Sequence, residues 1–186
     1  MNDLLFIDAE TTGFLTLDSP DSPRQPWPVE IAALLTKPDG ETVGSFEALI
    51  IPEGWSSHPG ALAVHGITEA HAEEHGIHLT TALAVLDVFA ERAGTVLAYP
   101  ARFDCGIIGC AAVRMKVRDP LDGKNVTCVQ KMVTAWNGNR AMKLITAYEH
   151  LMQRPLKAAH CARVDASACR DVYIALLAEA DRLANL

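Results

Sequence analysis

The pattern of apolar and polar positions divides the chain into a strand-rich N-terminal part and a largely helical remainder. Short apolar runs at residues 4–7, 29–35 and 44–51 predict three buried strands. Pro38-Asp-Gly40 lies between the second and third runs and predicts a hairpin turn. The proline-rich stretch 18–28 separates the first two runs, and its prolines exclude a helix or a strand there. We therefore expect an antiparallel group of strands with one long loop.

Helical spacing of apolar residues dominates the chain after residue 58. It is clearest in residues 80–92, where three large apolar side chains fall on one face. Thr80 or Thr81 offers a cap for the start of this helix, and Gly94 is expected to end it. Further helices are predicted at 59–64, 69–74, 103–114, 143–153 and 165–183, a strand at 95–99, and a short strand or strand-to-helix junction at 126–129.

The order of these elements and the composition indicate a globular α/β protein. An antiparallel group followed by alternating helices and strands favours a sandwich built on a mixed sheet. A chain of 186 residues fits one compact domain, so we expect a single domain over residues 1–186. Apolar residues make up 49% of the chain and charged residues 21%, which is typical of a folded protein and not of a disordered one.

Charge and cysteine usage limit the partners and the compartment. The formal net charge is −7, whereas nucleic-acid-binding domains are usually basic. This charge argues against tight non-specific binding of a duplex but not against the handling of a single strand end. No apolar run is long enough to cross a membrane, and the first residues are not the basic start of a signal peptide. The five cysteines include no Cys-x-x-Cys pair, so we expect reduced thiols, no zinc site and a cytoplasmic location.

Two carboxylates close the first predicted strand. Asp8 and Glu10 are separated by one residue, and strand side chains alternate with a period of two, so both point to the same side. Like charges at this spacing repel each other, and hard divalent cations such as Mg²⁺ or Mn²⁺ suit oxygen ligands of this kind. Thr11-Thr12-Gly13 then offers a tight turn with backbone N–H groups and hydroxyls. The ordinary alternative is a strand that ends in surface acids.

Two more acids and a histidine lie at the edges of later elements. Phe103-Asp104 follows the strand predicted at 95–99, and His160 precedes Asp165 at the start of the last helix. For each aspartate, the ordinary alternative is an acid favoured by the dipole at a helix N-terminus. A lone histidine is more often a surface or core residue. Positions at element edges would nevertheless allow these groups to converge on one site with the first two carboxylates.

Together these motifs resemble the DEDD exonuclease family in its histidine-containing branch, DEDDh. The resemblance rests on Asp-x-Glu-Thr-Thr-Gly at 8–13, Phe-Asp at 103–104 and His-x-Ala-x-x-Asp-Ala at 160–166. Val-Glu-Ile-Ala at 29–32 and Val-His-Gly-Ile-Thr at 64–68 are also similar to family segments, so the resemblance covers most of the chain. It implies an α/β fold of the ribonuclease H-like type, with a mixed central sheet flanked by helices.

The resemblance also implies a role for each matching residue. His160 would be the general base for an attacking water, because an imidazole can accept a proton near neutral pH. Two Mg²⁺ ions, with Mn²⁺ as a substitute, would be held by four metal ligands: Asp8, Glu10, Asp104 and Asp165. The substrate-binding candidates are Thr11, Thr12, His65 and Phe103. A turn or capping role is the alternative for His65, and a core anchor is the alternative for Phe103.

One family feature is replaced in this chain. The family usually shows His-Asn shortly before Phe-Asp, whereas this chain has Tyr99-Pro100. Proline removes an N–H group and a polar side chain from the loop that carries Asp104, so the substrate contacts there are expected to differ. Trp27 and Trp55 lie in predicted loops, where base stacking is one role for them. We expect instead that they pack over an edge of the core.

By resemblance, the chain is a metal-dependent 3′→5′ exonuclease that acts on single-stranded ends, with DNA preferred, and releases nucleoside 5′-monophosphates. It is similar to the proofreading epsilon subunits of bacterial DNA polymerase III, which suggests a DNA polymerase as a partner. Two alternatives stay open: an exoribonuclease of the ribonuclease T or oligoribonuclease type that acts on RNA 3′ ends, and an accessory subunit whose task is partner binding. No long tail follows Leu183, so free-standing action is preferred.

Overall fold

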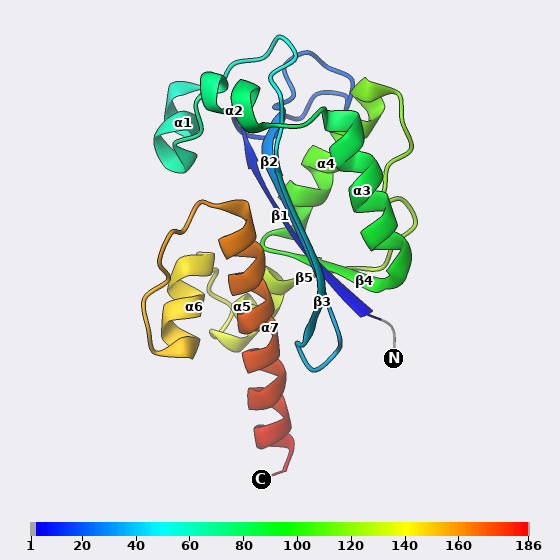
Figure 1. The fold of residues 1–186 in the computed structure, drawn as a ribbon. Helices are drawn as coiled ribbons and strands as arrows, with labels where there is room; N and C mark the ends of the chain where they lie inside the picture. The colour runs from blue at the N-terminus through cyan, green and yellow to red at the C-terminus, as the bar shows by residue number, and fades with distance from the viewer. Residues whose placement is uncertain (1–2, 186) are drawn as a thin grey trace.

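A five-stranded mixed sheet forms the centre of the fold (Figure 1). The computed structural model describes residues 3–185. The strands are β1 (Asp3–Thr11), β2 (Pro28–Thr36), β3 (Thr42–Leu49), β4 (Ala93–Ala98) and β5 (Val126–Cys128). Their order in the sheet is β3-β2-β1-β4-β5. The first three strands pair antiparallel, whereas β4 pairs parallel with β1 and with β5.

Helices cover both faces of this sheet, as the sequence predicted. On one face lie α3 (Leu79–Arg92) and α4 (Ala101–Met115). On the other face lie α5 (Val129–Trp136), α6 (Leu144–Met152) and α7 (Ala162–Ala184). The short helices α1 (Pro59–His65) and α2 (Glu69–His75) follow β3 at one end of the molecule (Figure 1).

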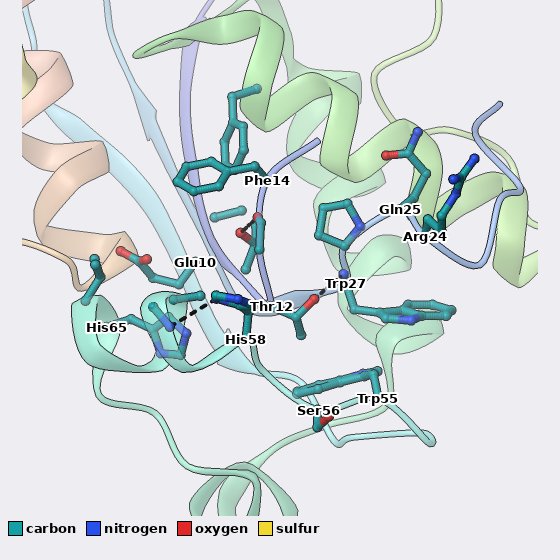
Figure 2. Close-up of a pocket in the computed structure, with 18 of the residues that line it drawn as sticks. Glu10, Thr12, Phe14, Arg24, Gln25, Trp27, Trp55, Ser56, His58 and His65 are labelled. Atoms are coloured by element: carbon teal, nitrogen blue, oxygen red, sulfur yellow. Dashed lines mark hydrogen bonds between the residues drawn. The ribbon is translucent and has the colours of Figure 1, made fainter. Parts of the chain in front are cut away.

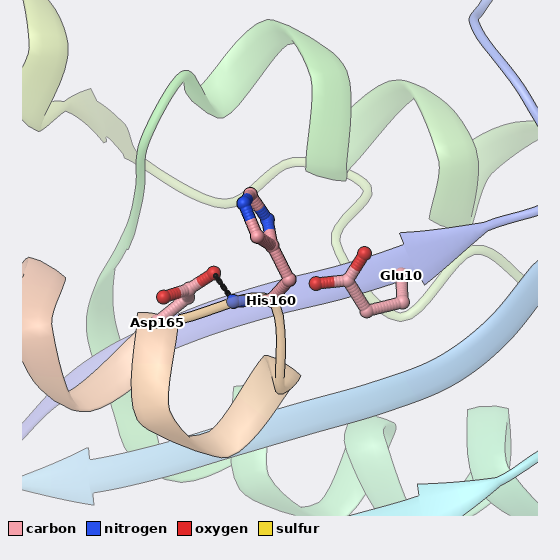
Figure 3. A group of neighbouring side chains, drawn as sticks. All are labelled: Glu10, His160 and Asp165. Atoms are coloured by element: carbon pink, nitrogen blue, oxygen red, sulfur yellow. Dashed lines mark hydrogen bonds between the residues drawn. The ribbon is translucent and has the colours of Figure 1, made fainter. Parts of the chain in front are cut away.

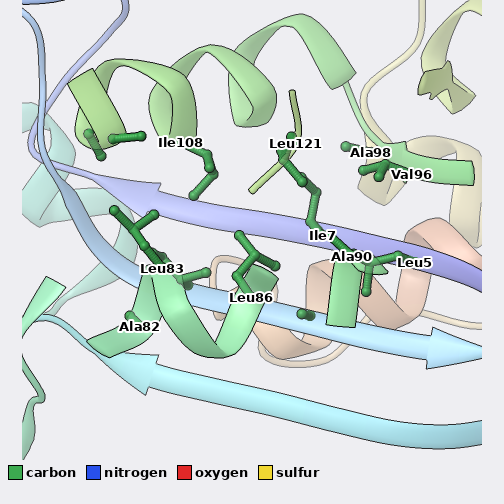
Figure 4. Packing of buried hydrophobic residues seen from close by; sticks show 14 of the residues in the cluster. Leu5, Ile7, Ala82, Leu83, Leu86, Ala90, Val96, Ala98, Ile108 and Leu121 are labelled. Carbon is green, nitrogen blue, oxygen red and sulfur yellow. The ribbon is translucent and has the colours of Figure 1, made fainter. Parts of the chain in front are cut away.

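Side-chain alternation along β1 separates two hydrophobic clusters. Leu5 and Ile7 join the cluster under α3 and α4 (Figure 4), whereas Phe6 joins the cluster under α5, α6 and α7. All nine residues of β2 are buried, because this strand lies between β1 and β3 and is covered on both faces. The even-numbered residues of β1 therefore face α7, which fixes the direction of the two carboxylates further along the strand.

The helix predicted at 80–92 is present, but its ends differ from the expectation. His78 is the N-cap, and neither Thr80 nor Thr81 caps the helix. Gly94 does not end it either, because the backbone leaves the helix at Ala93 and pairs at once with β1. Gly94 is therefore the second residue of β4. Pairing with a neighbouring strand decided this boundary, and the local glycine signal did not.

The stretch 126–129, predicted as a strand or a junction, holds both β5 and the start of α5. The sequence did not predict the rest of this helix, which spans only eight residues. Its buried residues are Val129 and Val133, one turn apart, and two positions are too few for a clear helical period. The predicted hairpin turn is confirmed between β2 and β3, where Gly40 has a positive φ of 92°.

The proline-rich stretch forms an ordered loop, residues 12–27, that is held at three places. The buried side-chain amide of Gln25 bonds to backbone groups within the loop, including the carbonyl of Asp18 at 2.9 Å. Arg114 of α4 donates to the carbonyls of Gln25 and Pro26, and its guanidinium lies 3.5 Å from the centre of the Trp27 ring. Leu15 packs so closely on Gly106 of α4 that a Cβ there would come within 2.6 Å of it.

The predicted free thiols agree with the structure, whereas the expected absence of a zinc site stays a prediction. All five cysteines are free thiols, and two of them, Cys110 and Cys169, are buried. Among the helices in residues 3–185, none has the combination of length and hydropathy that a bilayer span requires.

Candidate active site

Asp8 and Glu10 lie near the carboxyl end of β1, on the face that α7 covers. The last registered pair between β1 and β4 is Phe6 with Leu97, so both acids lie beyond the end of β4. Glu10 pairs across the strands with Glu30 of β2. Asp8 and Glu10 are the second and fourth residues after Phe6, so all three side chains point to the same face of the sheet. This agrees with the prediction that the two carboxylates share one side.

Asp104 reaches the same place from the other side of the sheet. It lies in the first turn of α4, and two residues connect the end of β4 to the start of this helix. The carboxylate is 2% exposed, and its Oδ1 accepts a hydrogen bond from the N–H of Ala9 at 3.2 Å. Its Oδ2 is buried without a hydrogen-bond partner in residues 3–185. An acid that only stabilised its own helix would not need this contact with β1.

Asp165 and His160 come from the start of α7 (Figure 3). Asp165 Oδ2 accepts the backbone N–H of His160 at 3.0 Å, while Oδ1 is buried and has no partner among the described residues. The His160 imidazole is exposed, and its backbone φ is 67°, in the left-handed region. One ligand atom each of Glu10, His160 and Asp165 lie within 4.8 Å of one another.

Burial and mutual repulsion make this cluster unfavourable for negative charge. Burial, followed by the repulsion of Asp165 and Glu30, raises the pKa of Glu10 to about 7. Burial raises the pKa of Asp104 to about 8 and that of Asp8 well above its usual range. The pKa of Asp165 is raised for the same reason, although its bond to His160 opposes the shift.

These residues fit a divalent cation. Unpartnered buried oxygens of Asp104 and Asp165 are ready ligands, and a hard cation would remove the repulsion that raises the pKa values. The four predicted carboxylates and His160 thus come together, from β1, from α4 on one face and from α7 on the other. Their convergence agrees with the sequence-based expectation.

Glu30 is a fifth acid at this site that sequence reasoning did not identify. It is 7% exposed, and its Oε2 accepts the N–H of Ala162, the first residue of α7, at 2.7 Å. The first N–H groups of a helix have no partner within the helix, so Glu30 caps α7 from a neighbouring strand. It thereby fixes the segment that carries His160 and Asp165. Burial raises its pKa, and the bond to Ala162 opposes this shift.

A pocket of about 780 Å³ opens beside Glu10 (Figure 2). We call it the aromatic pocket, because Phe14, Trp27, Trp55 and Phe103 are among its lining residues. Its walls are the turn at 11–13, part of the ordered loop, α1 and the segment 54–56. All four predicted substrate-binding residues line it: Thr11, Thr12, His65 and Phe103.

The polar groups of the aromatic pocket differ in their availability. The Thr11 hydroxyl donates to the carbonyl of Gly13 at 2.6 Å, so it serves the turn itself. The Thr12 hydroxyl accepts the N–H of Trp27 at 2.9 Å and keeps its own hydrogen for another acceptor. The His65 Nδ1 accepts the N–H of Ile67 at 3.0 Å, which leaves the proton of the neutral ring on Nε2. That Nε2 is buried and has no hydrogen-bond partner within 3.5 Å in residues 3–185; burial lowers the pKa of His65, and the nearby backbone of Thr11 opposes this shift.

The aromatic residues of the pocket include one that the sequence did not single out. Phe14 is 88% exposed and directly follows the Thr11-Thr12-Gly13 turn. An aromatic residue at this position next to the acids was the signal in the sequence that could have identified it. Trp27 packs against the core and under Arg114, as expected, and Trp55 also packs against the core, yet both line the pocket. Tyr99 does not: its hydroxyl donates to the carbonyl of Met142 at 2.7 Å, and its ring is buried under α5, α6 and α7.

Comparison with solved structures confirms the predicted ribonuclease H-like fold. Exonuclease I of E. coli in complex with a dA16 oligonucleotide matches with a TM-score of 0.79 and 20% identity over 98% of this chain and 42% of that chain. A moderately thermophilic exonuclease I from Methylocaldum szegediense matches with a TM-score of 0.77 and 19% identity, again over 98% of this chain and 42% of that chain. The present chain thus spans less than half of the length of these structures.

Comparison at the sequence level supplies the family. No curated protein matches the chain significantly. The family model RNase_T, described as exonuclease, matches residues 5–173, which include all four acids and His160. The finer likeness to epsilon subunits, a DNA polymerase partner and a cytoplasmic location stay predictions. The match covers most of the chain, and the chain therefore belongs to this exonuclease family.

Proposed function

We propose that residues 1–186 form a single domain that hydrolyses single-stranded nucleic acid from its 3′ end, with DNA preferred, and releases nucleoside 5′-monophosphates. Residues 1, 2 and 186 lie outside the described part of this range. The observation that carries the proposal is the convergence of four carboxylates and His160 at one edge of the aromatic pocket. Such a site can bind a phosphodiester at the acids and a terminal nucleoside in the pocket.

Two Mg²⁺ ions, or Mn²⁺ in their place, would be held by the carboxylates of Asp8, Glu10, Asp104 and Asp165. When bound, the ions would polarise the scissile phosphodiester and make an attacking water more acidic. The unpartnered oxygens and the raised pKa values of these carboxylates support this assignment. Ionised carboxylates repel the polyanionic substrate, so the cations are also needed for substrate to approach.

His160 would take the proton from the attacking water. Its imidazole is exposed beside Glu10 and Asp165, and its backbone is fixed by the hydrogen bond to Asp165 Oδ2. A base held in this way can meet a water at the phosphodiester without being buried itself. Because Asp165 binds the backbone and not the ring of His160, both ring nitrogens stay available for the water and for solvent.

The aromatic pocket would bind the terminal nucleotide. Phe103 and Phe14 offer faces for base stacking, which tolerates every base. The hydroxyl of Thr12 can donate a hydrogen bond to a sugar or phosphate oxygen, and the Nε2–H of His65 can do so once a movement of the ring or of α1 exposes this buried atom. Tyr99 takes no part, so the polar contacts that the family usually has before Phe-Asp are supplied here by other residues or are lost.

The test uses 5′-labelled DNA and RNA single strands of the same sequence, together with a closed circular single strand. With Mg²⁺ we expect a ladder that shortens from the 3′ end, 5′-monophosphate products by mass spectrometry, faster turnover of DNA and an intact circle. EDTA and the Asp8→Asn variant should each stop the reaction. Cleavage of the circle, or products with a 3′-phosphate, would overturn the proposal. Faster turnover of RNA than of DNA would mean that RNA is the preferred substrate.

A further inference from the structure

A second groove, about 510 Å³ in volume, lies between the α6–α7 connection and α7. Three cations line it: Arg154, Lys157 and Arg163. Asp171 is its only acidic lining residue among the described residues, and Arg170 already pairs with this carboxylate at 2.6 Å. We call this feature the basic groove. Its lining is cationic, whereas the chain as a whole carries a charge of −7.

The positive charge is concentrated in one segment of the chain. Residues 140–163 contain five lysines and arginines and a single acid, Glu149. Arg154 lies 5.6 Å from the centre of the Tyr148 ring, and neither Arg154 nor Lys157 forms an ion pair with a carboxylate of residues 3–185. Arg163 pairs with Glu47 at 2.8 Å. Two exposed cations in the groove thus lack a carboxylate partner in the described part of the chain, which leaves them available to an anion.

The basic groove and the catalytic cluster both include residues of the connection into α7 and of the first turns of this helix. Lys157 is three residues from His160, so their Cα atoms are at most about 11 Å apart, the reach of an extended chain. Arg163 is two residues before Asp165 in the first turn of α7. The aromatic pocket, in contrast, is lined by Glu10 but not by His160 or Asp165. The aromatic pocket and the basic groove share no lining residue, and Glu10 of the acidic cluster lines the former.

We propose that the basic groove binds the phosphodiester backbone of the strand on the 5′ side of the scissile bond. The inference rests on the proposed function: with the terminal nucleoside in the aromatic pocket and the scissile phosphate at the acids, the rest of the strand leaves on the α7 side. Flexible cations on an exposed surface contact phosphates without reading bases. Such contacts suit an enzyme that removes nucleotides regardless of their base.

The test compares two double charge reversals that change the net charge equally. Arg154→Glu/Lys157→Glu alters the basic groove, and Lys116→Glu/Lys124→Glu alters the connection between α4 and β5 as a control. For a 30-nucleotide DNA strand we expect the groove variant to raise KM at least tenfold with kcat within twofold, while the control stays near wild type. Hydrolysis of the p-nitrophenyl ester of thymidine 5′-monophosphate, which has no upstream strand, should be unchanged in both.

Binding of the same 30-mer, measured by fluorescence anisotropy with Ca²⁺ in place of Mg²⁺, gives a readout that does not require turnover. The slope of log Kd against log salt should fall by about 1.4 in the groove variant, since each lost phosphate contact on a single strand contributes about 0.7. Equal KM and equal slopes in the groove and control variants would overturn the inference. Binding by the wild type without hydrolysis of strand or ester would overturn the proposed function, and the slopes would still decide the role of the groove.

Discussion

The site residues on the two faces of the sheet are positioned in different ways. On the α4 side, Asp104 follows β4 after a short connection, is buried and is bonded to the backbone of β1. On the α7 side, His160 lies in an exposed connection that also contains positive-φ residues at Gln153 and Ala158. At its end, the carboxylates of Asp165 and Glu30 accept the backbone N–H groups of His160 and Ala162. The first side is a rigid platform, while the second depends on the charge state of the acids it carries.

Asp104→Asn tests the α4 side of the site and should cause the largest loss of turnover among the variants proposed here. Asparagine keeps an oxygen for the N–H of Ala9 but removes the charge. We expect turnover to fall below detection in Mg²⁺, well beyond the roughly 10–100-fold loss typical of residues that only support a metal ligand. Steady-state rates on a labelled single strand measure this. A loss of less than tenfold would exclude Asp104 as a ligand.

The same variant should stabilise the metal-free protein in a pH-dependent way. Because burial raises the folded-state pKa of Asp104 to about 8, the folded wild type binds more protons than the unfolded chain between about pH 4 and 8. Wild-type stability therefore falls as pH rises through this range, and the variant escapes this loss. At pH 8 in EDTA we expect Tm to rise by roughly 2–8 °C, the effect of about 1–2 kcal/mol. The gain should vanish near pH 4.

His160→Gly tests the exposed side and should lower kcat by about 10²–10⁴-fold, the usual contribution of a positioned base. Glycine suits the φ of 67° at this position, so the fold should be kept. Added imidazole should restore part of the rate, because it can replace the missing ring. His160→Ala is the control: it should be less stable than His160→Gly by roughly 1 kcal/mol, since a Cβ is strained there. Full activity of either variant would show that His160 is a bystander.

Two variants of Glu30 distinguish its role as a cap of α7 from the role of its charge. We expect them to have the smallest effect on kcat. Glu30→Gln keeps an oxygen for the N–H of Ala162, so we expect kcat within threefold of wild type. Glu30→Ala removes the cap, which costs about 0.5–2 kcal/mol, and should lower kcat roughly tenfold with little change in KM. Thermal melts and steady-state kinetics on the pair distinguish the two roles. Equal losses in both variants would mean that the charge of Glu30, and not its bond to α7, matters.

The sequence predicted the parts of the site that local pattern or family motif encodes. The alternation along β1 placed Asp8 and Glu10 together, and the motifs supplied Asp104, His160 and Asp165. Glu30 lies in the family-like segment 29–32, but the sequence predicted no role for it, because its partner Ala162 is 132 positions away. The fold of the proline-rich loop was equally hidden, since Arg114 binds it across 89 residues of sequence. Contacts of such separation leave no local signal.

The ordered loop 12–27 has a consequence for how this enzyme can diverge. Its anchors are Gln25, Arg114 and the contact of Leu15 with Gly106, whereas Phe14 and Leu17 are 88% and 96% exposed and belong to none of these contacts. The exposed positions can change without loss of an anchor, and none of them belongs to the acidic cluster. If the aromatic pocket binds the terminal nucleotide as proposed, substitutions at Phe14 can alter substrate preference while the acids that carry out hydrolysis stay unchanged.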